Sequence, residues 1–134
     1  MMSIKTKYAL AVLVKMALDE PQSYTIKQLS EACGVPKKYL EQILSVLRKE
    51  NIVSSTRGAN GGYTLARPAS LITVLEIASC LEQSLSFARG YNGAEAITEF
   101  WESIDEQFKT SLAITIDELV YNQLKTKQVL LYSI

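Results

Sequence analysis

The sequence predicts a mainly helical fold that carries one small β-hairpin. Two short helical patterns meet at Gly34, and the second is followed by two β-forming segments around a glycine-rich loop. Beyond Pro68 the pattern is helical again and includes one long amphipathic segment. Helix, turn, helix and hairpin in this order define a winged helix-turn-helix, here with a long additional helix on its C-terminal side.

The first three helices are expected at Ile4–Leu18, from Thr25 to Gly34, and from Pro36 onward. The first is apolar on nearly every side, so it should be buried on more than one face. Thr25 and Gln28 form a capping box that opens the second helix, and glycine ends it. Pro36 suits the first turn of the third helix.

The third helix has one apolar face and one polar, basic face. The apolar residues, spaced by three and four, are Leu40, Ile43, Leu44 and Leu47. A polar face can simply be solvated, but its place after a helix-turn and before a hairpin favours a surface that reads DNA. We expect base contacts from Lys38, Glu41 and Gln42. We expect phosphate contacts from Thr25, Lys27, Lys37 and Tyr39.

The hairpin is expected to pair Ile52–Thr56 with Tyr63–Ala66 around the loop Arg57–Gly62, which holds three of the six glycines. A glycine-rich loop can bind a nucleotide, but that use needs a following helix and a Gly-Lys-Ser/Thr motif, which this loop lacks. A DNA-contacting wing is therefore preferred, with Arg57 entering a minor groove. The other wing residues expected at DNA are Gly58, Asn60, Gly61, Gly62 and Tyr63.

The formal net charge of the 134 residues is zero, but the charges are unevenly distributed. Residues 1–68 contain ten Lys or Arg and five Asp or Glu, whereas residues 69–134 contain four and nine. The basic half suits phosphate, and the acidic half suits another role. Histidine is absent and no serine lies in a nucleophile motif, so an enzyme is not expected.

Beyond Pro68 two Thr-x-x-Glu capping boxes open a short helix at Thr73 and a last short helix at Thr115. Between these helices, residues 83–93 read as a loop, and a long helix starts at about Ala94. Its apolar stripe comprises Ile97, Trp101, Ile104, Phe108 and Leu112. Its acidic, solvated face comprises Glu95, Glu99, Glu102, Asp105 and Glu106.

The apolar stripe of the long helix needs a surface to pack against. It can pack on its own domain or across the twofold axis of a homodimer. We favour the homodimer, because it would set two recognition helices one DNA turn apart. The chain is then divided into a winged helix-turn-helix domain at 1–70, a dimerisation and effector region at 71–124 and a C-terminal tail at 125–134.

Two cysteines are present. Cys33 shares the inward stripe of the second helix, so we expect it in the core. A redox role for Cys80 is an open alternative, although the C-terminal end of a helix tends to raise a thiol pKa. Two thiols without imidazole cannot complete a four-ligand metal site within one chain, so no metal and no cofactor are expected. The cysteine spacing fits the cytoplasm, and the apolar run Tyr8–Val14 is too short to cross a membrane.

The segment Tyr39–Pro68, YLEQILSVLRKENIVSSTRGANGGYTLARP, resembles the signature of a bacterial winged-helix repressor family. That family includes the iron–sulfur cluster regulator and the nitric-oxide-sensing repressor. The resemblance extends over essentially the whole chain, including Ile72-Thr73 and Trp101. It implies a homodimer, crossed through the long helices, that binds a palindromic operator. Cluster-binding members carry three cysteines in the loop before the long helix. Because this loop has none, cluster binding does not carry over.

Among cluster-free members, the chain resembles the repressor of cysteine metabolism. That repressor is partnered by O-acetylserine thiol-lyase, whose active site accepts protein tails that end in isoleucine. The sequence here ends LLYSI, so Tyr132, Ser133 and Ile134 are expected either to bind that enzyme or to pack on their own dimer. Two further readings remain. One is a regulator of the same fold that senses a small molecule or oxidant beneath the loop. The other is an interaction module without DNA binding, which the basic half disfavours.

Overall fold

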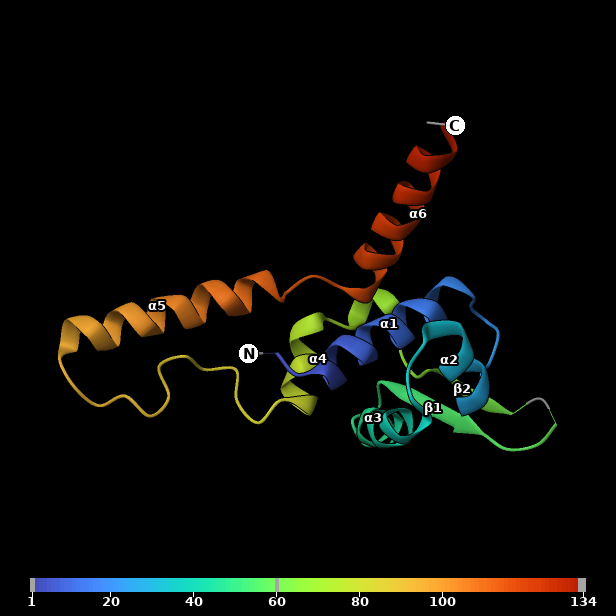
Figure 1. The fold of residues 1–134 in the computed structure, drawn as a ribbon, viewed down its shortest axis with the longest axis horizontal. Coiled ribbons are helices and arrows are strands. Elements are labelled where there is room, and N and C mark those ends of the chain that lie inside the picture. Colours follow the sequence, from blue (N-terminus) through green and yellow to red (C-terminus); the bar gives the residue numbers. More distant parts are fainter. Residues whose placement is uncertain (1, 60, 133–134) are drawn as a thin grey trace.

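The structure, a computed structural model, describes residues 2–59 and 61–132, with side chains described up to residue 128. It confirms a mainly helical fold with a two-stranded antiparallel sheet. The elements are α1 (Ile4–Leu18), α2 (Ile26–Cys33), α3 (Lys37–Lys49), β1 (Val53–Thr56), β2 (Gly62–Leu65), the 3-10 helix η1 (Ala69–Leu71), α4 (Val74–Leu81), α5 (Glu95–Ser111) and α6 (Ile116–Tyr132). In Figure 1, α5 extends from the body as an arm and α6 projects from another side.

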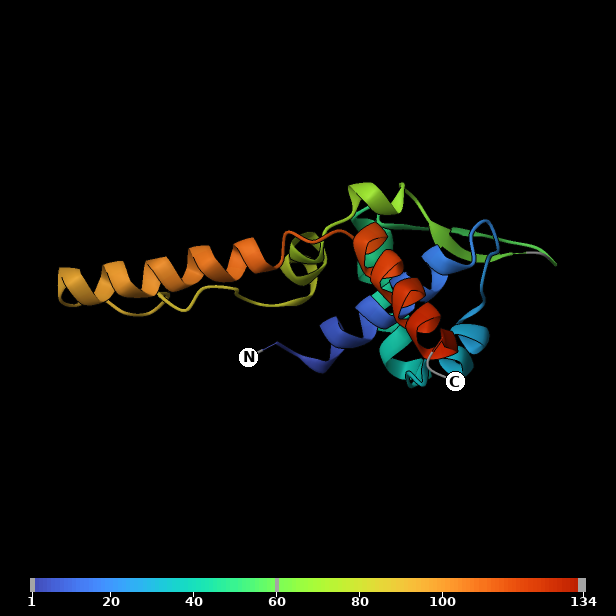
Figure 2. The same ribbon diagram turned by 90° about the horizontal axis from the view of Figure 1, so that it is seen from above.

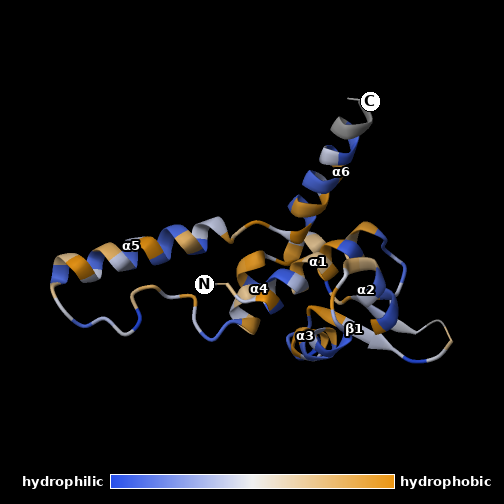
Figure 3. Cartoon of the chain, viewed as in Figure 1, coloured by the Kyte–Doolittle hydropathy of each residue, from blue (hydrophilic) through white to orange (hydrophobic). Residues whose placement is uncertain are grey.

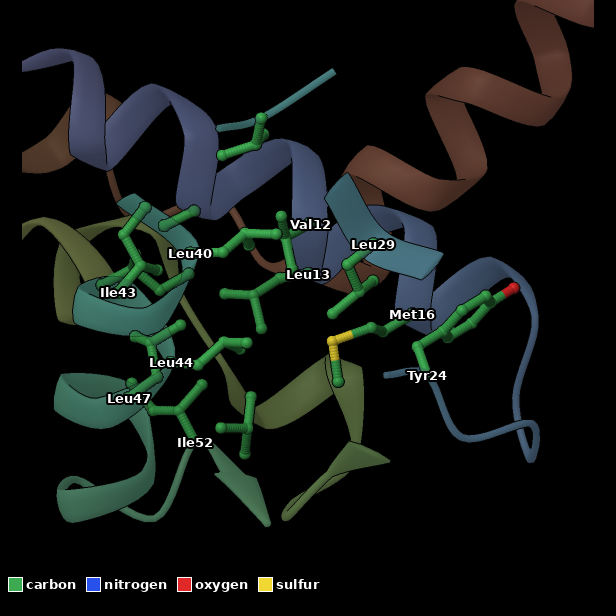
Figure 4. Close-up of a cluster of buried hydrophobic side chains, with 14 of the residues drawn as sticks. Val12, Leu13, Met16, Tyr24, Leu29, Leu40, Ile43, Leu44, Leu47 and Ile52 are labelled. Carbon is green, nitrogen blue, oxygen red and sulfur yellow. The ribbon is translucent and has the colours of Figure 1, made fainter. Parts of the chain in front are cut away.

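The hydrophobic core is built around α1, which packs against α2, α3, α4 and α6. This confirms that α1 is buried on more than one face. Figure 4 shows α1 side chains meeting those of α2, α3 and the start of the hairpin. The largest fully buried side chains in this region are Leu13, Met16, Leu29, Leu40, Ile43, Leu44, Leu47 and Ile52. The core thereby fixes α3 and the hairpin relative to each other.

Local signals place the ends of the second and third helices. Thr25 and Gln28 form both bonds of the predicted capping box, at 3.1 and 2.9 Å. Gly34 ends α2 in a left-handed conformation with φ of 67°, which glycine adopts without a Cβ clash. Pro36 is the cap residue just before α3, one position earlier than the first turn that the sequence predicts.

The later capping signals are half-formed. The hydroxyl oxygens of Thr73 and Thr115 each accept a bond from the backbone three residues on, both at 3.1 Å. Glu76, the glutamate of the first box, instead directs its carboxylate to Arg67. The charge-assisted bond to Arg67 is stronger than a bond to the cap backbone N–H would be.

The last helix is longer than the sequence predicts. α6 packs against α1 and η1 and continues to Tyr132, through the boundary expected at residue 125. Residues 117–132 contain no glycine or proline, so nothing local stops the helix there. Ser133 and Ile134 lie outside the described residues, and so does the side chain of Tyr132. None of the described helices is both long and apolar enough to cross a membrane.

The connection between α5 and α6 is tied to the start of α4. Val74 and Leu75 donate backbone hydrogen bonds to Ile114 and Leu112 at 2.9 and 2.7 Å, and Ile116 donates to Ile72 at 2.9 Å. The arm therefore leaves the body at a fixed point. Figures 1 and 2 both show the loop of residues 82–94 running alongside α5.

Candidate nucleic-acid interface

The outward face of α3 presents the side chains that the sequence assigns to DNA bases. The helix forms because its apolar residues recur at steps of three and four, and the four on the inner face are fully buried: Leu40, Ile43, Leu44 and Leu47. Burial of that stripe leaves the opposite one in solvent: Lys37, Lys38, Glu41, Gln42 and Ser45 are all exposed. At 13 residues, α3 is about 20 Å long, a length that a major groove admits.

The wing is the antiparallel pair β1–β2, in which Val53 lies opposite Leu65 and Thr56 lies opposite Gly62. Neither end of either strand differs by more than one residue from its predicted position. Arg57 and Gly58 are exposed beyond the end of β1, and Gly58 has a φ of 108°. Asn60, which the sequence also assigns to DNA, lies outside the described residues. Within them, the side chains of Lys38, Gln42 and Arg57 form no hydrogen bond or ion pair with other residues.

The wing is docked on the body through Tyr24 in the α1–α2 connection. Tyr24 and Tyr63 exchange two backbone hydrogen bonds, at 3.0 and 2.7 Å. Gly62 permits this approach: its φ is 146°, and a Cβ at this position would lie 2.5 Å from the Tyr24 carbonyl oxygen. Gly62 thus allows the wing backbone to pack against Tyr24, in addition to the DNA contact that the sequence predicts for it.

Tyr24 is itself held by a small charged network. Its hydroxyl donates to Asp19, and Lys15 pairs with the same carboxylate at 2.9 Å. The Tyr24 hydroxyl, and then Lys15, lower the pKa of Asp19. Sequence patterns did not single out Tyr24, because its partners belong to the end of α1 and to β2.

The residues expected to contact phosphate lie at the starts of α2 and α3. Thr25 and Lys27 are exposed at the start of α2, where backbone N–H groups and the helix dipole favour an anion. Tyr39 is half-buried and its ring centroid lies 5.9 Å from that of Tyr8, which sequence reasoning missed. In Figure 1, α3 and the wing lie along the side of the body opposite to α6.

The loop between α4 and α5 is organised by a carboxylate that the sequence analysis placed on a solvated face. Asp105 is only 9% exposed. It accepts hydrogen bonds from the backbone of Phe87, from the Ser86 hydroxyl at 2.7 Å and from the backbone of Ala88 at 3.4 Å. The Phe87 bond foremost lowers the pKa of Asp105. The expectation of a solvated Asp105 is therefore wrong, because the folded loop presents N–H donors to that side of α5.

Glu82, at the other end of this loop, is tied to the N-terminal segment. It accepts bonds from the backbone and hydroxyl of Ser3, at 3.2 and 2.5 Å, and from the Thr6 hydroxyl. Burial would raise the pKa of Glu82, but these hydrogen bonds outweigh it and lower the pKa. A cavity of about 310 Å³ lies beside Glu82, and Leu85 and Phe87 of the loop, together with Phe108 of α5, supply much of its apolar wall.

The apolar stripe of α5 is only partly covered within one chain. Ile97 is 46% exposed, and Trp101, Ile104, Phe108 and Leu112 are half-buried. Phe100, which sequence reasoning left out of the stripe, is 53% exposed and packs edge-on against Trp101 at 5.1 Å. Figure 3 shows apolar patches along the length of α5 between polar ones.

Both cysteines are half-buried free thiols. Burial raises the pKa of Cys33, and the charge of Lys15 opposes this effect. Burial also raises the pKa of Cys80, together with the nearby charges of Glu50 and Glu76. A raised pKa lowers the thiolate fraction, so neither environment activates a thiol at neutral pH.

Comparison with known proteins places the chain in one family. The Rrf2 family, described as iron-dependent transcriptional regulators, matches residues 2–122. The HTH-type transcriptional regulator IscR of Xenorhabdus nematophila is 35% identical, with 89% of this chain and 78% of that protein covered. IscR of Klebsiella pneumoniae is 37% identical over the same shares.

Solved structures agree with this placement. CymR, the global cysteine regulator of B. subtilis, superposes with a TM-score of 0.83 at 30% identity, covering 91% of this chain and 97% of that one. IscR of T. potens superposes with a TM-score of 0.79 at 30% identity, covering 92% and 88%. The chain therefore belongs to the Rrf2 family of transcriptional regulators.

Proposed function

We propose that the chain is a homodimeric repressor that binds a palindromic DNA operator through α3 and the wing. The observation that supports this proposal is the pairing of an exposed polar stripe on α3 with a wing that Tyr24 docks beside it. In this proposal Lys38, Glu41 and Gln42 read bases, Arg57 enters the minor groove, and Thr25, Lys27, Lys37 and Tyr39 contact phosphate. The remaining wing contacts come from Gly58, Asn60, Gly61, Gly62 and Tyr63.

The second part of the proposal is dimerisation through α5. The stripe Ile97, Trp101, Ile104, Phe108 and Leu112 would pack against its twofold copy and cover the exposed apolar surface. Two recognition helices would then be held one helical turn of DNA apart, roughly 34 Å. A regulator of this kind binds the chromosome, so we assign it to the cytoplasm.

Selection from a pool of random DNA duplexes tests both parts together. Wild-type protein should enrich an inverted repeat whose half-site centres are about 10 base pairs apart. Sedimentation of the selected duplex with protein should give two chains per duplex. Enrichment of a motif without twofold symmetry, or no enrichment, would contradict the proposal.

We further propose that this regulator acts without an iron–sulfur cluster. Such clusters are held by cysteine thiolates, in some cases with histidine. The loop of residues 82–94 contains neither residue type. Among the described residues, no group of three or more His, Cys, Asp or Glu is arranged to hold a metal ion. The residues present therefore do not fit the cluster. Protein purified without oxygen should contain no iron or acid-labile sulfide, and stoichiometric amounts of both would contradict this.

The proposal also covers the signal that controls the regulator, for which there are two candidates. We propose control of cysteine metabolism through O-acetylserine thiol-lyase, bound by Tyr132, Ser133 and Ile134. Similarity to CymR, a cysteine regulator, supports it. The cavity beside Glu82 instead favours direct sensing of a small molecule. Mixing the enzyme with the full chain and with a chain lacking residues 131–134 separates them, because only the first candidate predicts binding that the truncation abolishes.

A further inference from the structure

Arg67 follows the wing directly, and its guanidinium joins three segments of the chain. Its Nε donates to the carbonyl of Asn51 at 3.1 Å, between α3 and β1. One terminal nitrogen donates to the carbonyl of Leu71 at 3.2 Å, at the end of η1. The other pairs with the carboxylate of Glu76 on α4 at 2.5 Å. We call these three contacts the Arg67 bracket.

The side-chain bond to Asn51 lies next to the backbone ladder of the wing. Val53 lies opposite Leu65, and the backbone N–H of Ala66 donates to Ile52 at 2.9 Å, so position 67 falls opposite position 51. Asn51 has a φ of 57° and is the one non-glycine residue with a positive φ in the described part of the chain. Arg67 thus binds the carbonyl of the turn that ends α3 and starts β1.

The bond to Glu76 connects Arg67 to α4. Glu76 lies in the first turn of α4, whose start is capped by Thr73 and held by the α5–α6 connection. The Arg67 side chain is 30% exposed, and each of its three nitrogens has a protein acceptor. This differs from Arg57, which is exposed and forms no such contact within the described residues.

We propose that Arg67 is a positioning residue for DNA binding, fixing the wing and the end of α3 relative to α4 without contacting a phosphate. The proposal rests on the DNA-binding function proposed above. A basic residue at the root of a wing could equally be one more phosphate contact. Lysine at position 67 distinguishes the two roles. It keeps the charge that a phosphate contact needs, but it lacks the planar guanidinium that reaches three acceptors.

Binding of the selected duplex by fluorescence anisotropy, measured over a series of salt concentrations, separates the two roles. Arg67→Lys and Arg67→Met should each weaken binding by about tenfold or more, because both variants lose hydrogen bonds that the charged guanidinium donates. Neither should change the slope of log affinity against log salt. Arg57→Met is the matched control, and it should make that negative slope shallower by about 1. Binding restored by lysine at 67, or a shallower slope for Arg67→Met, would overturn the proposal.

A second measurement does not depend on DNA. Amide hydrogen exchange of the free protein should become faster in β1, β2 and residues 50–52 of Arg67→Lys, and stay unchanged in α2. Glu76→Gln should give a weaker form of the same pattern, and the double variant should show less than the sum of the two single effects. Unchanged exchange in the wing of Arg67→Lys would refute the bracket even if the protein bound no DNA. Failure of wild-type binding alone would refute only the proposed function.

Discussion

Replacing Gly62 with alanine should detach the wing from the body. A Cβ at residue 62 would lie 2.5 Å from the Tyr24 carbonyl oxygen, closer than real side chains approach backbone, so the two segments must separate. Gly58 is a matched control: it also has a positive φ, of 108°, but a Cβ there has nothing within 4 Å. Both substitutions share the backbone strain, about 1–3 kcal/mol.

The difference between the two variants isolates the clash. Separation removes the two Tyr24–Tyr63 hydrogen bonds, and each contributes about 1 kcal/mol net to stability. Gly62→Ala should therefore lower the free energy of unfolding by about 2 kcal/mol more than Gly58→Ala does. Urea denaturation followed by circular dichroism measures both values. Equal free energies for the two variants would show that Gly62 does not dock the wing.

Three further predictions concern the loop, the arm and the thiols. Asp105→Asn should lower the melting temperature at neutral pH. Because the pKa of Asp105 is lowered in the folded state, its stabilisation is complete above the ordinary value of about 3.9 and is lost as pH falls through the folded-state value. The gap to wild type should therefore narrow in acid, and a gap independent of pH would count against this reading. Ile97→Asp should shift the protein from dimer to monomer in sedimentation equilibrium. The control Glu99→Gln, on the polar face, should remain a dimer. A dimeric Ile97→Asp variant would refute the α5 interface. Cys80, with its raised pKa, should react with iodoacetamide at pH 7 more slowly than cysteine in an unstructured peptide does. Rapid alkylation would support a redox role instead.

The fold was predictable where its signals are local. The capping box at Thr25, the left-handed Gly34 and the buried stripe of α3 depend on residues three or four positions apart, and each can be read directly from the sequence. The glycine-rich loop likewise indicated a hairpin, because the segments on both sides favour strands. These elements also contain most of the candidate DNA contacts.

The tertiary contacts of the wing root and of the α4–α5 loop were not predictable in this way. Glu82 bonds Ser3, which is 79 residues away, and Arg67 bonds Asn51, which is 16 residues away. In the sequence, Asp105 is indistinguishable from the other acidic residues of a solvated face. Only the folded loop of residues 82–94 brings its donors to Asp105. Such partners meet only in the tertiary fold, and their residue types are equally common on surfaces. The length of α6, by contrast, could have been read from the sequence, because residues 117–132 contain no glycine or proline and no signal marks a stop at residue 125.

Base readout by α3 is the central claim, and repeating the duplex selection with Gln42→Ala tests it most directly. Glutamine pairs with adenine through two hydrogen bonds, and loss of such a pair removes about 1–3 kcal/mol of discrimination at one base pair. The variant should select the wild-type inverted repeat with preference lost at one position in each half-site, placed symmetrically. A variant that selects the wild-type motif with full preference at every position would contradict the claim that α3 reads the operator through Gln42.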